Sequence, residues 1–168
     1  ARGLIVHRPN KGVEVVEFTP DEVDALYELR LILEEAAALR TPLPCPNETT
    51  FKMEEIALQH EKAVQEKDFR AVYRLNQQFH ELQYSACGNP RLADLIGYNA
   101  RAAQPIRVVK YDDSEHMKTI VSQHFDIIKA MRGTSSQDLV AAVRAHLPAS
   151  AEAYRILYER RYGRIPRV

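Results

Sequence analysis

The chain has 168 residues, enough for one domain with a sizeable hydrophobic core. Its 23 basic and 23 acidic residues cancel, so the net charge gives no bulk attraction to nucleic acid or to a membrane surface. No apolar run approaches the roughly 20 residues of a membrane span, and Arg2 precedes no apolar block typical of a signal peptide. We therefore expect a cytoplasmic protein, in which Cys45 and Cys87 are free thiols because they lack the spacing of a CxxC pair.

The first residues differ from all that follow. Two β-rich runs, 4–6 and 13–16, flank a segment rich in turn formers, 7–12, and this pattern predicts a β-hairpin. A lone hairpin is marginally stable in water. It is either a ribbon lying on the body of the protein or the remnant of a larger domain, and the abrupt start in a strand slightly favours the remnant.

The first helix is predicted from Thr19, as N-cap, to about Arg40, with Pro20 at its first position and Glu22 completing a capping box. Arg30 lies beside the apolar stripe of this helix, with Glu34 one turn later. Either the two side chains form an intrahelical ion pair, or the guanidinium of Arg30 is directed into a cavity, where it can hold a carboxylate.

Five more helices are predicted after the proline-rich link 41–46, each delimited by caps or breakers. Pro105 is expected to kink the fourth helix of the chain near residues 101–105, and Pro148 to bend the sixth helix just beyond His146. The predicted fold class is therefore all-α, an antiparallel six-helix bundle with an N-terminal β-hairpin remnant. Residues 1–18 form the hairpin, and residues 19–168 form the helical domain. The five helices are predicted at about 47–67, 68–88, 90–110, 114–132 and from 136 onward.

Four residues on apolar faces form a candidate metal site. Asn76 and His80 are four residues apart in the third helix, so they stack on one face beside its apolar stripe. His124 and His146 lie on the apolar faces of the last two helices. Neutral imidazoles bind zinc, nickel, copper and iron, and three of them leave a coordination position open for water or a small anion. His60 also lies near an apolar stripe, where we expect a structural or edge role.

The chain resembles the effector-binding domain of GntR-superfamily transcription regulators of the FadR C-terminal type. The resemblance covers about residues 21–158, and residues 1–18 are similar to the wing hairpin of the family's winged-helix DNA-binding domain. The motifs that carry it, in order, are Leu26-Tyr27-Glu28-Leu29-Arg30 with Glu34; Leu75-Asn76-Gln77-Gln78-Phe79-His80; Gly88-Asn89-Pro90-Arg91-Leu92; Gln123-His124; and Arg144-Ala145-His146.

The resemblance implies a divalent metal ion, zinc or nickel, held by Asn76, His80, His124 and His146. It also implies a small organic acid bound at the open metal position near Arg30, a homodimer, and DNA binding through a winged-helix domain mostly absent here. Asn76 stands where the family more often has an aspartate.

Two other functions remain open. A metal-dependent hydrolase could use the three-histidine site to activate water, but no acidic residue has the spacing of a general base beside His124 or His146. A metal-free helical dimerisation module would instead bury hydrogen-bonded histidines. His116, near a helix start, is expected to be solvated or to act as a cap.

Overall fold

A computed structural model of the protein describes the backbone of residues 5–8, 12–15 and 17–163, and side chains from Glu17 to Gly163. Strands β1 (Ile5–Arg8) and β2 (Gly12–Val15) pair antiparallel, with Ile5 opposite Val15. The predicted turn between them lies outside the described residues.

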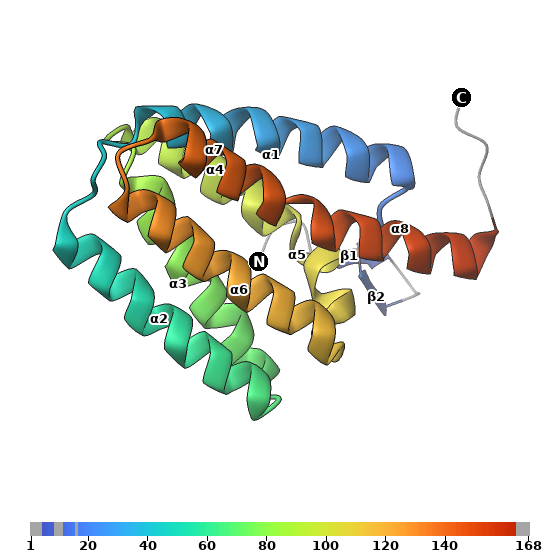
Figure 1. The fold of residues 1–168 in the computed structure, drawn as a ribbon. Helices are drawn as coiled ribbons and strands as arrows, with labels where there is room; N and C mark the ends of the chain where they lie inside the picture. The colour runs from blue at the N-terminus through green and yellow to red at the C-terminus, as the bar shows by residue number, and fades with distance from the viewer. Residues whose placement is uncertain (1–4, 9–11, 16, 164–168) are drawn as a thin grey trace.

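The rest of the described chain is helical, so the predicted all-α bundle is confirmed (Figure 1). None of its helices is long and apolar enough to cross a membrane. The elements after the strands are α1 (Pro20–Arg40), α2 (Asn47–Gln65), α3 (Phe69–Ser85), α4 (Pro90–Ala102), α5 (Gln104–Arg107), the 3-10 turn η1 (Val108–Lys110), α6 (Ser114–Arg132), α7 (Ser136–His146) and α8 (Pro148–Tyr162).

Side-chain caps fix the starts of α1, α3 and α4 at the predicted places. The hydroxyl of Thr19 accepts the N–H of Glu22, whose carboxylate accepts the N–H of Thr19, which completes the capping box. Asp68 and Asn89 cap α3 and α4 in the same way. These caps satisfy backbone N–H groups that have no partner within the helix.

The helix count predicted from the sequence is wrong, and two prolines explain the difference. Pro105 does not kink one long helix but separates α4 from α5 and η1, and Pro148 begins a new helix instead of bending the old one. A proline has no N–H to donate, and its ring clashes with the carbonyl four residues earlier, so the preceding helix ends. Similarly, α2 ends two residues early because Lys67 is left-handed, with φ of 55°.

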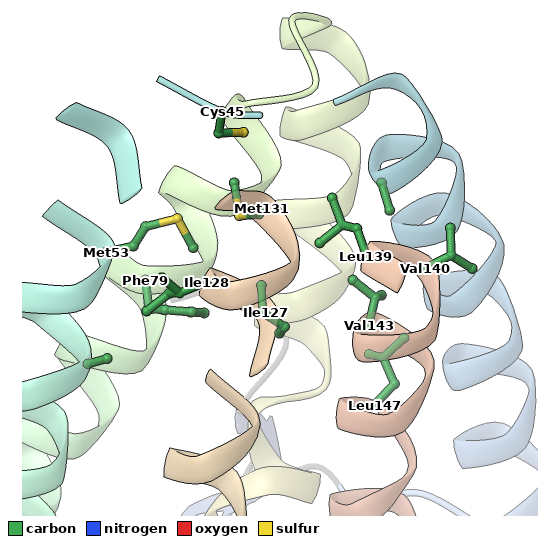
Figure 2. Packing of buried hydrophobic residues seen from close by; sticks show 12 residues of the cluster. Cys45, Met53, Phe79, Ile127, Ile128, Met131, Leu139, Val140, Val143 and Leu147 are labelled. Carbon is green, nitrogen blue, oxygen red and sulfur yellow. The ribbon is translucent and has the colours of Figure 1, made fainter. Parts of the chain in front are cut away.

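The main hydrophobic core lies between α2, α3, α6 and α7 (Figure 2). Met53, Phe79, Ile127 and Met131 are fully buried in it, and the free cysteine Cys45 lies at its edge. Packing of α2 on α3 and α6, and of α7 on α1 and α6, brings one face each of α3, α6 and α7 together. These are the helices that carry the three predicted histidine ligands.

A hydroxyl group ties the connection before α1 to the C-terminal helix. Tyr154 of α8 accepts a hydrogen bond from the N–H of Phe18 (2.9 Å) and donates one to the Phe18 carbonyl (3.2 Å). Near the end of α8, Arg161 and Tyr162 both contact the carboxylate of Glu17, at 3.1 and 2.7 Å. The segment that follows the strands is therefore held on α8 as well as on α1.

Candidate metal centre and anion cavity

Three of the four predicted ligands meet in one buried cluster. The coordinating atoms of His80 (α3), His124 (α6) and His146 (α7) all lie within 4.8 Å of one another. Their ring centroids form a nearly equilateral triangle with sides of 5.2, 5.0 and 5.0 Å. His80 and His124 are buried, whereas His146 is partly exposed. The apolar stripes of three helices thus place three imidazoles at one point.

Two glutamines fix the protonation of the outer ring nitrogens. Nδ1 of His80 lies 2.9 Å from Oε1 of Gln83, and Nδ1 of His146 lies 3.1 Å from Oε1 of Gln123. The amide nitrogen of Gln123 donates to the Ala145 carbonyl, so the oxygen is the atom that faces His146. Both Nδ1 atoms therefore carry the proton, as is usual for histidines that bind a metal through the other nitrogen.

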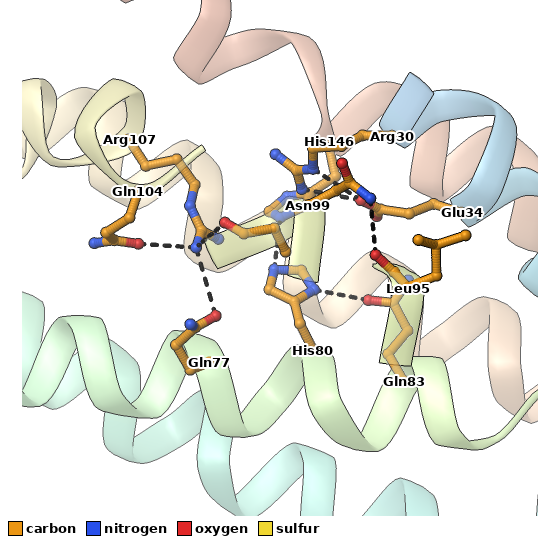
Figure 3. A network of polar contacts seen from close by, with 11 residues as sticks. Arg30, Glu34, Gln77, His80, Gln83, Leu95, Asn99, Gln104, Arg107 and His146 are labelled. Carbon is orange, nitrogen blue, oxygen red and sulfur yellow. Dashed lines mark hydrogen bonds and ion pairs between the residues drawn. The ribbon is translucent and has the colours of Figure 1, made fainter. Parts of the chain in front are cut away.

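With this tautomer, two lone pairs face each other inside the protein. Nε2 of His80 lies 3.1 Å from Nε2 of His146 (Figure 3). Zinc–nitrogen bonds of about 2.0–2.1 Å place two ligand nitrogens roughly 3.3 Å apart in a tetrahedral site. Both ring nitrogens of His124 are buried and have no hydrogen-bond partner in the part of the chain that the structure describes. Facing lone pairs and an unpartnered imidazole fit a bound cation, and this is the chemistry of a metal centre.

Burial keeps the histidines neutral, which is the form that binds metal. Desolvation lowers the pKa of His146 to about 3, with the nearby positive charges of Arg30 and Arg107 adding to the effect. Desolvation also holds the pKa of His80 and of His124 well below the ordinary value for histidine. No proton has to be displaced from these rings at neutral pH before a metal binds.

The fourth predicted ligand and the predicted arginine line a cavity beside the cluster. Asn76 is buried one turn before His80 and faces a cavity of about 30 Å³ that also reaches Arg30 and His146. Nε and Nη2 of Arg30 donate to Oε1 of Glu34, at 3.1 and 3.0 Å. The two interpretations of Arg30 are therefore compatible, because the ion pair forms and the arginine still lines the cavity.

Several residues of this region were not predicted. Arg107 lines the cavity from α5, and the break before this helix concealed it in the sequence. His60 is fully buried, lines the same cavity and lies with its ring centroid 5.1 Å from that of His124, so an edge position is wrong. His116 is half-buried and also lines the cavity, a position that the sequence did not indicate. Gln83 could have been found, because it lies three residues after His80 on one helical face.

Comparison with known proteins identifies a family that covers most of the chain. The model of the FCD domain matches residues 25–149. The chain is 24% identical over 151 residues to the HTH-type transcriptional regulator YdhC of Bacillus subtilis, covering 89% of this chain and 67% of that protein. It is 23% identical over 153 residues to the HTH-type transcriptional repressor RspR of Escherichia coli, covering 91% and 67%. The chain thus spans about two thirds of the length of these relatives.

Solved structures share the fold. E. coli McbR/YncC superposes with a TM-score of 0.74 at 16% identity, over 94% of this chain and 74% of that one. A GntR transcriptional regulator from Rhodococcus sp. RHA1 superposes with a TM-score of 0.71 at 18% identity, over 90% and 72%. At such low identity these likenesses support the helical architecture and carry no information about the ligand.

Proposed function

The chain belongs to the FCD domain family and is the effector-binding domain of a GntR-family transcription regulator, and from this premise we propose that it binds a divalent metal ion together with a small organic acid. The observation that carries the proposal is the pair of Nε2 atoms of His80 and His146, which face each other at 3.1 Å. The ring nitrogens of the third imidazole, His124, have no hydrogen-bond partner among the described residues.

In this proposal His80, His124 and His146 hold the ion, and Asn76 supplies a carbonyl oxygen or holds a metal-bound water. The metal would be zinc or nickel, since both bind neutral imidazole. When bound, it supplies an electrophilic position that a carboxylate oxygen can occupy. Gln83 and Gln123 keep two of the rings oriented, and Arg30 provides a guanidinium on the cavity side for the acid.

The rest of the regulator follows from the same premise. Residues 1–18 are the wing hairpin of a winged-helix DNA-binding domain, and residues 19–168 are the ligand-binding and dimerisation domain. The regulator is a cytoplasmic homodimer whose acid ligand changes the placement of the two DNA-binding domains, which requires different affinities of the ligand for the two arrangements. Its named relatives are transcription regulators, which supports a role in binding instead of catalysis.

The dimer surface would lie on α1 and α4, which pack side by side. Both helices carry large exposed apolar side chains, although such residues are ordinarily buried. Ile32 of α1 is 59% exposed and Tyr98 of α4 is 66% exposed. The apolar residues exposed on these two helices are Leu29, Ile32, Leu39, Leu95 and Tyr98. A second copy of the chain would cover them.

Elemental analysis of the purified protein tests the metal site. We expect near-stoichiometric zinc or nickel in the parent and its loss from His80→Ala and His124→Ala. His116→Ala is the matched control, because this residue lies by the cavity but outside the triad, and it should retain the metal. A parent that stays free of metal after incubation with either ion would refute the proposal and support the metal-free dimerisation module.

A further inference from the structure

The cavity beside the histidine cluster contains a positive charge that no acidic side chain balances. Arg107 is only 8% exposed. Its Nη2 donates to Oε1 of Gln104 (2.9 Å), to the Ala100 carbonyl (3.2 Å) and, at 3.5 Å, to Oε1 of Gln77 (Figure 3). These acceptors are all neutral, and Arg107 takes part in none of the ion pairs among the described residues.

Part of the Arg107 guanidinium also lacks a hydrogen bond. Its Nε is buried and has no partner among the described residues. A buried charge without a counter-charge is costly, and a donor without an acceptor adds to that cost. A group bound in the cavity would reduce this cost, and an anion would supply both the counter-charge and the missing hydrogen-bond acceptor.

Arg30 on the opposite side of the cavity is in a different state. Its guanidinium is balanced by Glu34, and the two side chains are both almost fully buried. The pair is therefore neutral as a unit, whereas Arg107 contributes one full positive charge. An acid bound in this cavity is attracted by the net charge of Arg107 more than by that of Arg30.

Asn76 adds to the excess of positive charge around the cavity. This inference rests on the metal ion of the proposed function. Three neutral imidazoles and a neutral amide leave the double charge of a divalent ion unreduced, whereas an aspartate at position 76 would remove one unit. Together with Arg107, the site would then have three positive charges and no anionic ligand of its own.

We propose that the effector is a short dicarboxylate, with one carboxylate at the open metal position and the other on Arg107. A monocarboxylate would leave most of the positive charge unbalanced. The cavity beside the metal position has a volume of only about 30 Å³, so it can take the second carboxylate and a short link to the metal-bound carboxylate, but no longer chain. The class is thus that of malonate and succinate.

Other unpartnered groups around the cavity suit the same ligand. The hydroxyl of Tyr27 and both ring nitrogens of His60 are buried and form no hydrogen bond with the described residues, and both side chains line the cavity. Two carboxylates offer four oxygen acceptors, more than one metal position and one guanidinium can use. Tyr27 and His60 can donate to the oxygens that remain.

Isothermal titration of the zinc-loaded protein with malonate, succinate, acetate, propionate and sulfate tests the proposal. We expect the better dicarboxylate to bind at least about thirtyfold more tightly than either monocarboxylate, the size of effect that loss of a buried charge partner produces. Sulfate is a compact dianion, so it tests whether the site requires two separate carboxylates or only a double negative charge. Equal affinity for acetate and malonate, or tightest binding of sulfate, would overturn the proposal.

Two variants, Arg107→Gln and Asn76→Asp, and one control variant locate the effect. Arg107→Gln should abolish the preference for the dicarboxylate, and Arg101→Gln, which removes an exposed guanidinium from neighbouring α4, should leave it unchanged. Asn76→Asp, which adds one negative charge, should reduce the preference even if Arg107→Gln fails to fold. Preferences unchanged in Asn76→Asp and in a folded Arg107→Gln would refute the proposal.

Metal content measured on the same preparations separates the two proposals. Stoichiometric zinc with no preference between mono- and dicarboxylates would refute the dicarboxylate while leaving the metal site intact. A protein that binds no metal but retains a preference that depends on Arg107 would refute the metal site alone.

Discussion

Nε2 of His80 and Nε2 of His146 lie 3.1 Å apart, although the two residues are 66 positions apart in the chain. Each ring is held by a glutamine on its outer nitrogen, Gln83 for His80 and Gln123 for His146. The position of the facing nitrogens therefore depends on groups that never touch the ion.

The first prediction concerns these glutamines. Gln123→Leu removes the acceptor of the His146 Nδ1–H, so we expect zinc affinity to fall by about 10- to 100-fold, as is typical when an outer partner of a metal ligand is lost. Competition titration with a chelating dye measures the change. Gln77→Leu is the control, since Gln77 contacts Arg107 and no ring nitrogen of the triad. Equal affinities for parent and Gln123→Leu would contradict the assigned tautomer.

The second prediction concerns acid stability of the metal-free protein. Burial lowers the pKa of His60 to about 4 from the ordinary 6.5, so between these pH values the unfolded chain binds one proton that the folded chain does not. The free energy of unfolding therefore decreases as the pH falls through this window, by about 1.4 kcal/mol per pH unit for this one group.

Substitution of His60 isolates its contribution to the pH dependence of the free energy of unfolding. His60→Met fills the buried site with an apolar side chain of similar size and removes the titration. Denaturant unfolding in EDTA at several pH values from 4 to 6.5 should give a slope for the variant that is smaller than that of the parent by about 1.4 kcal/mol per unit. Parallel curves for the two proteins would show that His60 is accessible to protons in the folded state.

The third prediction concerns the ion pair between Arg30 and Glu34. Arg30→Met leaves a buried carboxylate without its partner, so we expect a loss of about 3–5 kcal/mol in the free energy of unfolding. Arg30→Met combined with Glu34→Met should recover most of this loss, because replacement of both charges by apolar groups is often neutral. Urea denaturation of the two variants and the parent measures the difference. A double variant as unstable as the single one would show that the pair itself stabilises the fold.

The fourth prediction concerns the exposed apolar residues of α1 and α4. Ile32→Glu together with Tyr98→Glu should convert the dimer to a monomer, because each places a charge in a surface that association would bury. Light scattering after size-exclusion chromatography measures the mass. Leu58→Glu is the control, since this residue of α2 is 54% exposed but lies on a different helix. A parent that is already monomeric would refute the dimer.

Local signals in the sequence were sufficient for the starts of α1, α3 and α4 and for placing the three histidines on apolar helix faces. Thr19, Asp68 and Asn89 are capping residues whose effect depends on the next few residues only, so they could be identified directly. His80 and His124 could be found because each interrupts an apolar stripe of regular period.

The remaining features depend on contacts between distant segments. Arg107 follows a helix break at Pro105, and no periodic pattern in the sequence indicates which way its side chain turns. His60 occupied an apolar stripe like the other histidines, and only the packing of α2 on α6 placed it beside His124 and outside the triad. Tertiary packing, which periodicity does not encode, decides both.

The hydrogen bonds between Tyr154 and Phe18 couple α8 to the segment that precedes α1. This helix begins next to the cavity, where Leu147 and Ser150 form part of the lining, and its far end holds Glu17. Its 15 residues span about 22 Å at 1.5 Å each. A tilt of about 5° at the cavity end, with the helix rigid, displaces the far end by roughly 2 Å. A rigid α8 would therefore transmit a tilt at the cavity to the segment that follows the strands, with a displacement in proportion to the length of the helix.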